Sequence, residues 1–154
     1  MIVTSPMARW QRPSRFSWLM GMYAENYWTL TRLLGPQHLR IGRYRSVGNL
    51  GFPLLLEVVE RAPFTVEFKL SYALVDAVTG QPDPSAHVRF YLDAKVAEVT
   101  ACHCGSRIEH ALGRDANVAE VLSHRLRMNA FLGKWLSYLE DCGHSRFGLH
   151  AEAD

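Results

Sequence analysis

The strongest constraint on the fold is a stretch of alternating side chains at residues 87–100, HVRFYLDAKVAEVT. Apolar residues recur at every second position on both sides of the dipeptide Asp93-Ala94. A strand directs successive side chains to opposite faces, so alternation on both sides of a short break is typical of a β-hairpin. The sequence therefore predicts two antiparallel strands joined at Asp93-Ala94.

Counting outward from this turn gives the register of the two strands. Leu92 then faces Lys95 beside the turn, and Arg89 faces Glu98 further along. The apolar residues of both arms fall together on the opposite face. An opposite-charge pair directly across two strands contributes about 0.2–1 kcal/mol. The register that buries the apolar residues thus also predicts Arg89 opposite Glu98.

Further alternation extends the hairpin into a larger sheet. In residues 64–75 an apolar face alternates with a polar one, as in an antiparallel sheet with one buried and one solvated side. A shorter alternation after residue 106 adds an optional sixth strand. The strands are predicted at residues 40–49, 54–61, 64–75, 87–92, 96–100 and 107–112.

Two segments place apolar residues at three- and four-residue spacing, which predicts helices at residues 17–34 and 118–141. Gly35-Pro36 ends the first helix, and Gly143 ends the second. The predicted fold is α+β: an antiparallel sheet of five or six strands, with the N-terminal and C-terminal helices packed on one face. The other face of the sheet is left partly open.

Two asparagines are expected to link these elements. Asn26 and Asn129 both lie beside the apolar stripe of a predicted helix. Buried amides need hydrogen-bond partners, so we expect the two side chains to bond each other or a strand edge.

A chain of 154 residues fits one domain with its own core. Residues 1–15 carry prolines and arginines and are predicted to form a flexible basic tail. Residues 16–144 form the single α+β domain, and residues 145–154 a C-terminal tail. Hydrophobic residues make up 48% and charged residues 21%, which is typical of a globular protein and argues against global disorder.

Charge and apolar runs argue against several classes of partner. The net charge is only +2, so bulk charge gives no reason to expect nucleic acid. No apolar run approaches the ~20 residues of a membrane span, and the N-terminus lacks the uninterrupted apolar region of a secretory signal. Three cysteines are an odd number, which fits a reducing compartment better than a disulfide framework. We therefore expect a cytoplasmic protein without a membrane partner.

Four groups of residues, in one order from about residue 19 to residue 143, form a recognisable pattern. They are Asn26, Tyr27 and Leu30 with residues 32–34; residues 58–60 with Phe64 and Thr65; residues 88–91, 93–94 and 96–99; and Asn129, Phe131, Leu132, Trp135, Leu136, Tyr138 and Gly143. This pattern resembles the YqiB-like family, a group of small bacterial cytosolic proteins of unknown function. The resemblance implies a bacterial, single-domain protein and supplies no catalytic residues.

The first candidate site lies on the polar face of the predicted sheet. Two carboxylates and an arginine of this surface suit ligand clamping or acid–base chemistry. The simpler alternative is a structural ion pair with turn residues. The residues of this surface are Glu60, Arg89, Tyr91, Asp93 and Glu98.

A metal site is the second candidate. Cys102 and Cys104 are two residues apart at a strand end, while Cys142 and His144 follow the last helix. Three thiolates and one imidazole are a set that zinc accepts in tetrahedral geometry. The alternatives are reduced cysteines, at least one of them in the core, or a nucleophile at Cys104 or Cys142 activated by a histidine.

Weak RNA binding is a third hypothesis. The N-terminal arginines and a predicted strand with Arg40, Arg43, Tyr44 and Arg45 form basic-aromatic segments. A charged strand is also the ordinary way to protect a sheet edge from pairing.

No phosphate-binding glycine loop, G-x-S-x-G elbow or H-E-x-x-H helix is present in the sequence, which lowers the expectation of an enzyme. The favoured hypothesis is a binding or protein-interaction module that uses the open face of the sheet. Its partner is a protein, a small molecule or a second copy of the chain. A small hydrolase or metal-dependent enzyme is the alternative, and no cofactor is expected apart from zinc under the metal hypothesis.

Overall fold

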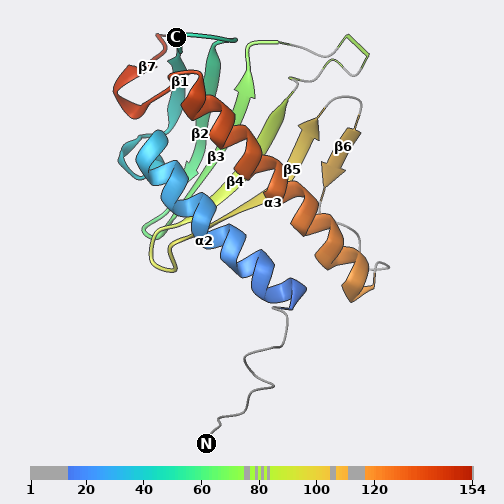
Figure 1. Ribbon diagram of the computed structural model, residues 1–154. Coiled ribbons are helices and arrows are strands. Elements are labelled where there is room, and N and C mark those ends of the chain that lie inside the picture. The colour runs from blue at the N-terminus through green and yellow to red at the C-terminus, as the bar shows by residue number, and fades with distance from the viewer. Residues whose placement is uncertain are drawn as a thin grey trace, which may run out of the picture.

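Two helices pack on one face of a seven-stranded antiparallel sheet (Figure 1). The computed structural model describes residues 14–74, 77–78, 80, 82, 84–104, 107–110 and 117–153, and for Cys104 and residues 107–110 it describes the backbone alone. The α+β prediction is confirmed, with both helices on one face. The sheet has one strand more than the six predicted.

The strands follow one another as a meander, in the order β6-β5-β4-β3-β2-β1-β7. Only β7 departs from this meander order, because it follows β6 in the chain but pairs with β1 at the other edge of the sheet. The strands are β1 (Gly42–Ser46), β2 (Leu54–Arg61), β3 (Thr65–Tyr72), β4 (Ser85–Tyr91), β5 (Val96–Cys104), β6 (Arg107–His110) and β7 (Leu149–Ala151).

The predicted register of the β4–β5 hairpin is confirmed, with Arg89 directly opposite Glu98. The turn differs from the prediction, because pairing ends at Tyr91 opposite Val96 and leaves a four-residue connection at 92–95. Within it Lys95 adopts a left-handed φ of 57° and donates its N–H to the Tyr91 carbonyl at 2.9 Å. Ala resists a positive φ, so the left-handed residue falls one position later and Leu92 does not face Lys95.

A bulge on β5 decides where the Cys-His-Cys segment points. His87 pairs with Ala101 and Val88 with Val99, so Thr100 is an extra residue on β5. An extra residue shifts the alternation of faces by one. Cys102 therefore points into the core, which confirms the expectation of at least one core cysteine.

Both helices begin at a side-chain cap. α2 (Arg15–Leu33) is capped by Ser14, whose Oγ accepts the Ser17 N–H at 3.1 Å. α3 (Val118–Asp141) is capped by Asn117, whose Oδ1 accepts the Glu120 N–H at 2.8 Å. Such caps satisfy amides that lack partners inside the helix.

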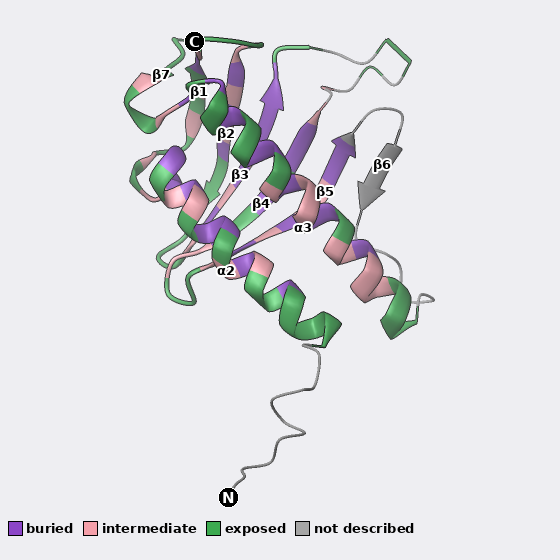
Figure 2. Cartoon of the chain, viewed as in Figure 1, coloured by how far each residue is buried: buried purple, intermediate pink, exposed green. Residues whose placement is uncertain are grey.

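The core lies between the helices and the sheet, where the buried residues of both layers meet (Figure 2). The Tyr27 ring of α2 stacks on the Phe90 ring of β4, with centroids 4.4 Å apart. Leu132 and Leu136 of α3 are fully buried. Burial of each such side chain stabilises the fold by about 1.5–3 kcal/mol.

The two asparagines join both helices to β5. Asn26 donates from Nδ2 to the Asn129 carbonyl at 3.1 Å, and Asn129 Oδ1 accepts the Val99 N–H at 3.0 Å. Among the described residues β6 pairs with β5 at residues 101–104, and beyond them the Val99 amide bonds α3. The expected bond to a strand is confirmed for Asn129, whereas Asn26 bonds the backbone of Asn129 and not its side chain.

The ends of the chain differ from the predicted tails. A 3-10 turn, η2 (Arg146–Gly148), and strand β7 occupy most of the region 145–154. Three residues are too few to show alternation, which is why the sequence does not predict β7. At the other end, Ser14 and Arg15 belong to the start of α2, and the rest of the expected basic tail lies outside the described residues. Within the described part of the chain, neither helix has the length and apolar character needed to cross a membrane.

Candidate functional site

The face of the sheet turned away from the helices carries the polar candidates. Strand pairing places side chains of neighbouring strands in rows across this face. One row contains Arg43, Glu57, Lys69 and His87 of β1 to β4. A second row contains Glu67, Arg89 and Glu98 of β3 to β5. We call this surface the open face.

The second row is a connected ion network. Arg89 Nε lies 2.7 Å from Glu67 Oε1, and Arg89 Nη1 lies 4.0 Å from Glu98 Oε1. The Tyr91 hydroxyl donates to Glu98 Oε1 at 2.9 Å. Three of the five predicted surface residues, Arg89, Tyr91 and Glu98, are thus brought together.

A helix completes the network from the edge of the sheet. Arg125 of α3 places Nη1 3.5 Å from Glu98 Oε2, so cations approach Glu98 from two elements. The Glu98 side chain is only 17% exposed, and its neighbours hold it in one position. Burial raises the pKa of Tyr23, the α2 residue that also faces Arg125 and Glu98.

Two donors of the network, Arg89 and Tyr91, keep their protons near neutral pH. Hydrogen bonding to Tyr91, and then to Glu67, raises the pKa of Arg89. Burial is the main cause that raises the pKa of Tyr91, so this phenol stays protonated and continues to donate. A fixed set of donors and acceptors is suited to orienting a partner, whereas a general acid–base group needs a pKa near the working pH.

The other two predicted surface residues lie at the margins of this network. Glu60 pairs opposite Glu67 after a bulge in β2 and is exposed. Asp93 accepts the Ala94 N–H at 2.8 Å within the β4–β5 turn. Both therefore flank the network without joining it.

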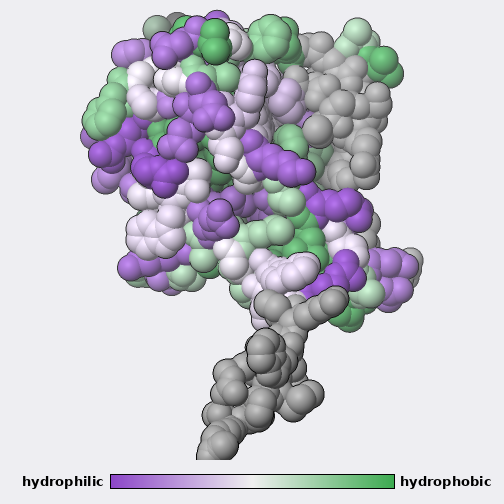
Figure 3. All heavy atoms as spheres, in the orientation of Figure 1, coloured by the Kyte–Doolittle hydropathy of each residue, from purple (hydrophilic) through white to green (hydrophobic). Residues whose placement is uncertain are grey.

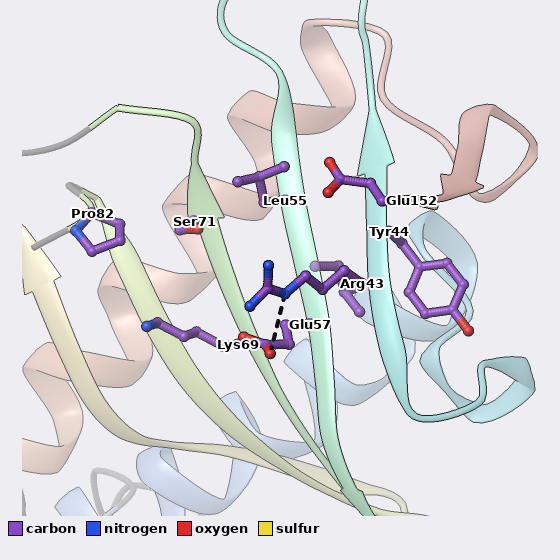
Figure 4. Close-up of a pocket in the computed structure, with 9 residues that line it drawn as sticks. Arg43, Tyr44, Leu55, Glu57, Lys69, Ser71, Pro82 and Glu152 are labelled. Carbon is purple, nitrogen blue, oxygen red and sulfur yellow. Dashed lines mark ion pairs between the residues drawn. The ribbon is translucent and has the colours of Figure 1, made fainter. Parts of the chain in front are cut away.

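A pocket of about 190 Å³ opens on the same face over β1 to β3, in the first row (Figure 4). Arg43 and Glu57 form an ion pair within it, with Nε 3.6 Å from Oε2. Lys69 lies directly across from Glu57, yet its side chain extends away from that carboxylate in Figure 4. The pocket is lined by Arg43, Tyr44, Leu55, Leu56, Glu57, Lys69, Ser71, Pro82 and Glu152.

Sequence reasoning did not assign this pocket. Alternation in residues 64–75 does place Lys69 on the polar face, and Arg43 belongs to the predicted basic strand. The missing step is the pairing of β1 with β2, which brings Arg43 and Glu57 together across the intervening loop. That pairing is specified by the sheet as a whole and leaves no local signal.

The predicted metal ligands do not all converge. Cys102 points into the core on β5, whereas the Cys142 carbonyl accepts the Asn49 N–H beside the end of β1. Three strands separate β5 from β1, a span of roughly 19 Å at the usual strand spacing. One zinc ion, which binds thiolates at about 2.3 Å, cannot hold both sulfurs. The Cys104 side chain lies outside the described residues.

His144 has a structural partner in its own corner of the fold. Its Nδ1 lies 2.8 Å from Ser46 Oγ, and the ring is buried. Burial lowers the pKa of His144, partly offset by a hydrogen bond with the Phe52 backbone. Among the described side chains, no three Cys, His, Asp or Glu residues are grouped closely enough to hold a metal.

The basic strand is largely neutralised by its neighbours. Arg43 pairs with Glu57, and Arg45 pairs with Glu152 at 3.6 Å. The arginines at positions 9 and 12 of the N-terminal segment lie outside the described residues.

A second hollow, of about 430 Å³, lies between the first turns of α2 and α3. Its walls are mostly apolar, and apolar residues are visible between the two helices in Figure 3. The residues that line it are Phe16, Leu19, Met20, Tyr23, Val118, Val121, Leu122 and Arg125.

Comparison with known proteins gives one match. No curated protein and no solved structure matches the chain at a significant level. A family model described as a protein of unknown function, DUF1249, matches residues 29–145. The matched region runs from the last turns of α2 through strands β1 to β6 and α3, well over half of the chain. The chain therefore belongs to the DUF1249 family of proteins of unknown function.

Proposed function

We propose that this protein is a binding module whose working surface is the open face of its sheet. The observation that carries the proposal is the pocket over β1 to β3, where Lys69 extends away from the carboxylate directly across from it. In the described part of the chain Lys69 forms no ion pair, although its row supplies Glu57 at the adjacent position. A cation held beside the pocket and unpaired among the described residues is suited to a ligand.

The ion network supports the same proposal from the neighbouring row. A rigid polar platform next to the pocket is formed by Glu67, Arg89 and Glu98. Tyr91 and Arg125 hold the Glu98 carboxylate in place. The Arg89 side chain is 44% exposed, so it is accessible to a partner. Binding sites are preorganised in this way, because a rigid surface loses less entropy when it binds.

The test is a screen of small polar fragments by two-dimensional ¹H–¹⁵N NMR on the full chain. We expect fragment-induced shifts to cluster on amides of β1 to β5. Arg89→Ala should weaken the fragments that shift β4 and β5. Lys134→Ala, an exposed cation on α3, is the matched control and should leave all shifts unchanged.

Stability separates a binding role from a structural one. Surface ion pairs contribute about 0–1 kcal/mol, so Arg89→Ala should lower the melting temperature by no more than roughly 2–4 °C. Shifts confined to the helices, or a large loss of stability with unchanged fragment binding, would overturn the proposal.

The setting of this function is the bacterial cytosol, as the resemblance to the YqiB-like family implies. Two reduced cysteines, Cys102 and Cys142, are buried in the described part of the chain and support a reducing compartment.

A further inference from the structure

We infer that the open-face pocket binds the carboxylate group of a small monoanionic ligand with a short apolar body. The inference rests on the proposed function, because it names the ligand class of the same surface. It is drawn from the donors, the floor and the charges of the pocket.

The donors come from two strands that line the pocket, Arg43 from β1 and Lys69 from β3. Arg43 contacts Glu57 through Nε at 3.6 Å. In Figure 4 the Arg43 guanidinium lies between Leu55 and Glu57, over β2. A guanidinium fork binds a carboxylate through two parallel hydrogen bonds, and an ammonium adds a third donor.

The residues at the bottom of the pocket and the pocket volume limit the size and polarity of the ligand's apolar part. Leu55 is half-buried on the open face and pairs with Ser71 of β3. The volume of about 190 Å³ equals the space of roughly six water molecules in the liquid. A carboxylate with a few carbon atoms fills this space, whereas drug-sized ligands need about 300–1,000 Å³.

The surrounding charges favour a single negative charge. Arg43 and Lys69 are balanced by two carboxylates in the lining, Glu57 and Glu152. Glu152 is held at the rim by Arg45 and by its own N–H, which donates to the Arg43 carbonyl at 2.8 Å. These four groups carry no net charge, so a dianion such as phosphate gains little more from them than a monoanion does, whereas its removal from water costs more. The pocket is therefore selective for a monoanion.

The test uses isobutyrate as the probe, titrated into the ¹⁵N-labelled full chain at constant ionic strength. Isobutyramide, which has nearly the same shape and no charge, and inorganic phosphate are titrated in parallel. We expect saturable shifts in β1 to β3 with isobutyrate, weaker ones with phosphate and none with isobutyramide. Lys69→Ala should weaken isobutyrate binding about tenfold, as expected for loss of a charge-assisted hydrogen bond.

Lys69→Gln removes the charge but keeps most of the side-chain stem. It should weaken isobutyrate binding as much as Lys69→Ala does, which would show that the lost charge and not lost packing causes the effect. Arg43→Ala should act in the same direction, and Lys134→Ala should have no effect. Equal binding of isobutyrate and isobutyramide, phosphate binding as tight as isobutyrate binding, or unchanged affinity in Lys69→Ala would overturn the inference. If other fragments still map to the open face, the proposed function stands and only the carboxylate assignment fails. If no fragment maps there, both fail.

Discussion

Arg89 lies directly opposite Glu98 in the sheet, yet its closest ion pair is with Glu67 on the other neighbouring strand. The nitrogen–oxygen distance is 2.7 Å to Glu67 and 4.0 Å to Glu98. Glu98 is already bound by the Tyr91 hydroxyl and by Arg125. Cross-strand position thus brings Arg89 and Glu98 near each other, while competing partners decide which carboxylate Arg89 binds.

Double-mutant cycles should reproduce this ranking. We expect a coupling free energy of about 0.5–1 kcal/mol between Arg89 and Glu67, near the upper end for partly exposed pairs. The coupling between Arg89 and Glu98 should be below about 0.3 kcal/mol, because the pair is longer and screened by solvent. Urea denaturation of the single and double Gln variants measures both values. A larger coupling to Glu98 would contradict the ranking.

Asn129→Ala should destabilise the protein by about 1–3 kcal/mol, because it leaves the covered Val99 N–H without its acceptor. It also removes the donor to the Arg125 carbonyl, at 2.8 Å. Ser137→Ala, an exposed substitution on the same helix, is the control and should stay within roughly 0.5 kcal/mol of the parent. Equal midpoints of urea unfolding in the two variants would show that the Asn129 bridge does not hold α3 to β5.

Two glycines should respond in opposite directions to alanine. A Cβ at Gly48 would overlap the Cys142 carbonyl oxygen, which also accepts the Asn49 N–H. Because backbone must move, Gly48→Ala should cost about 2 kcal/mol or more. A Cβ at Gly21, on the exposed side of α2, meets nothing within 4 Å. Gly21→Ala should therefore stabilise the protein by about 0.5–1 kcal/mol.

Thermal or urea unfolding of both variants measures the contrast. If Gly48→Ala were as stable as the parent, the segment after β1 would not pack against the end of α3 as closely as described.

His144 should make stability depend on pH below about 6.5, the ordinary pKa of histidine. Burial lowers the pKa of His144 in the folded state, so the unfolded chain takes up its proton first as the pH falls. The free energy of unfolding should be unaffected by this group above about pH 6.5 and should decrease from there down through the lower folded pKa.

His144→Asn removes this titration, and its unfolding free energy should fall less steeply than that of the parent between about pH 7 and pH 5. Ser137→Ala, an exposed substitution on α3 that removes no titratable group, is the control and should keep the parent slope. Parallel slopes for the parent and His144→Asn would show that another group carries the pH dependence.

Local sequence patterns alone determine much of the fold of this protein. The β4–β5 register, both helices and the bonding of Asn26 and Asn129 follow from alternation, helical spacing and the needs of buried amides. These signals depend on residues close together in the chain, and strand alternation leaves only one register that buries the apolar face. Of the five surface residues that the sequence predicts, Arg89, Tyr91 and Glu98 lie together, and Glu60 and Asp93 flank them.

The tertiary structure decided which partners those residues contact and where the pocket over β1 to β3 lies. Glu67 competes for Arg89 from β3, Arg125 reaches Glu98 from α3, and the pocket combines Arg43, Glu57 and Lys69 from three strands. The strand β7 and the separation of Cys102 from Cys142 likewise depend on the order of strands across the sheet. Alternation in the sequence predicts which face of the sheet a side chain occupies. It does not predict which strand will pair with the strand that carries that side chain. Partners distant in the chain are therefore fixed only when the whole sheet has assembled.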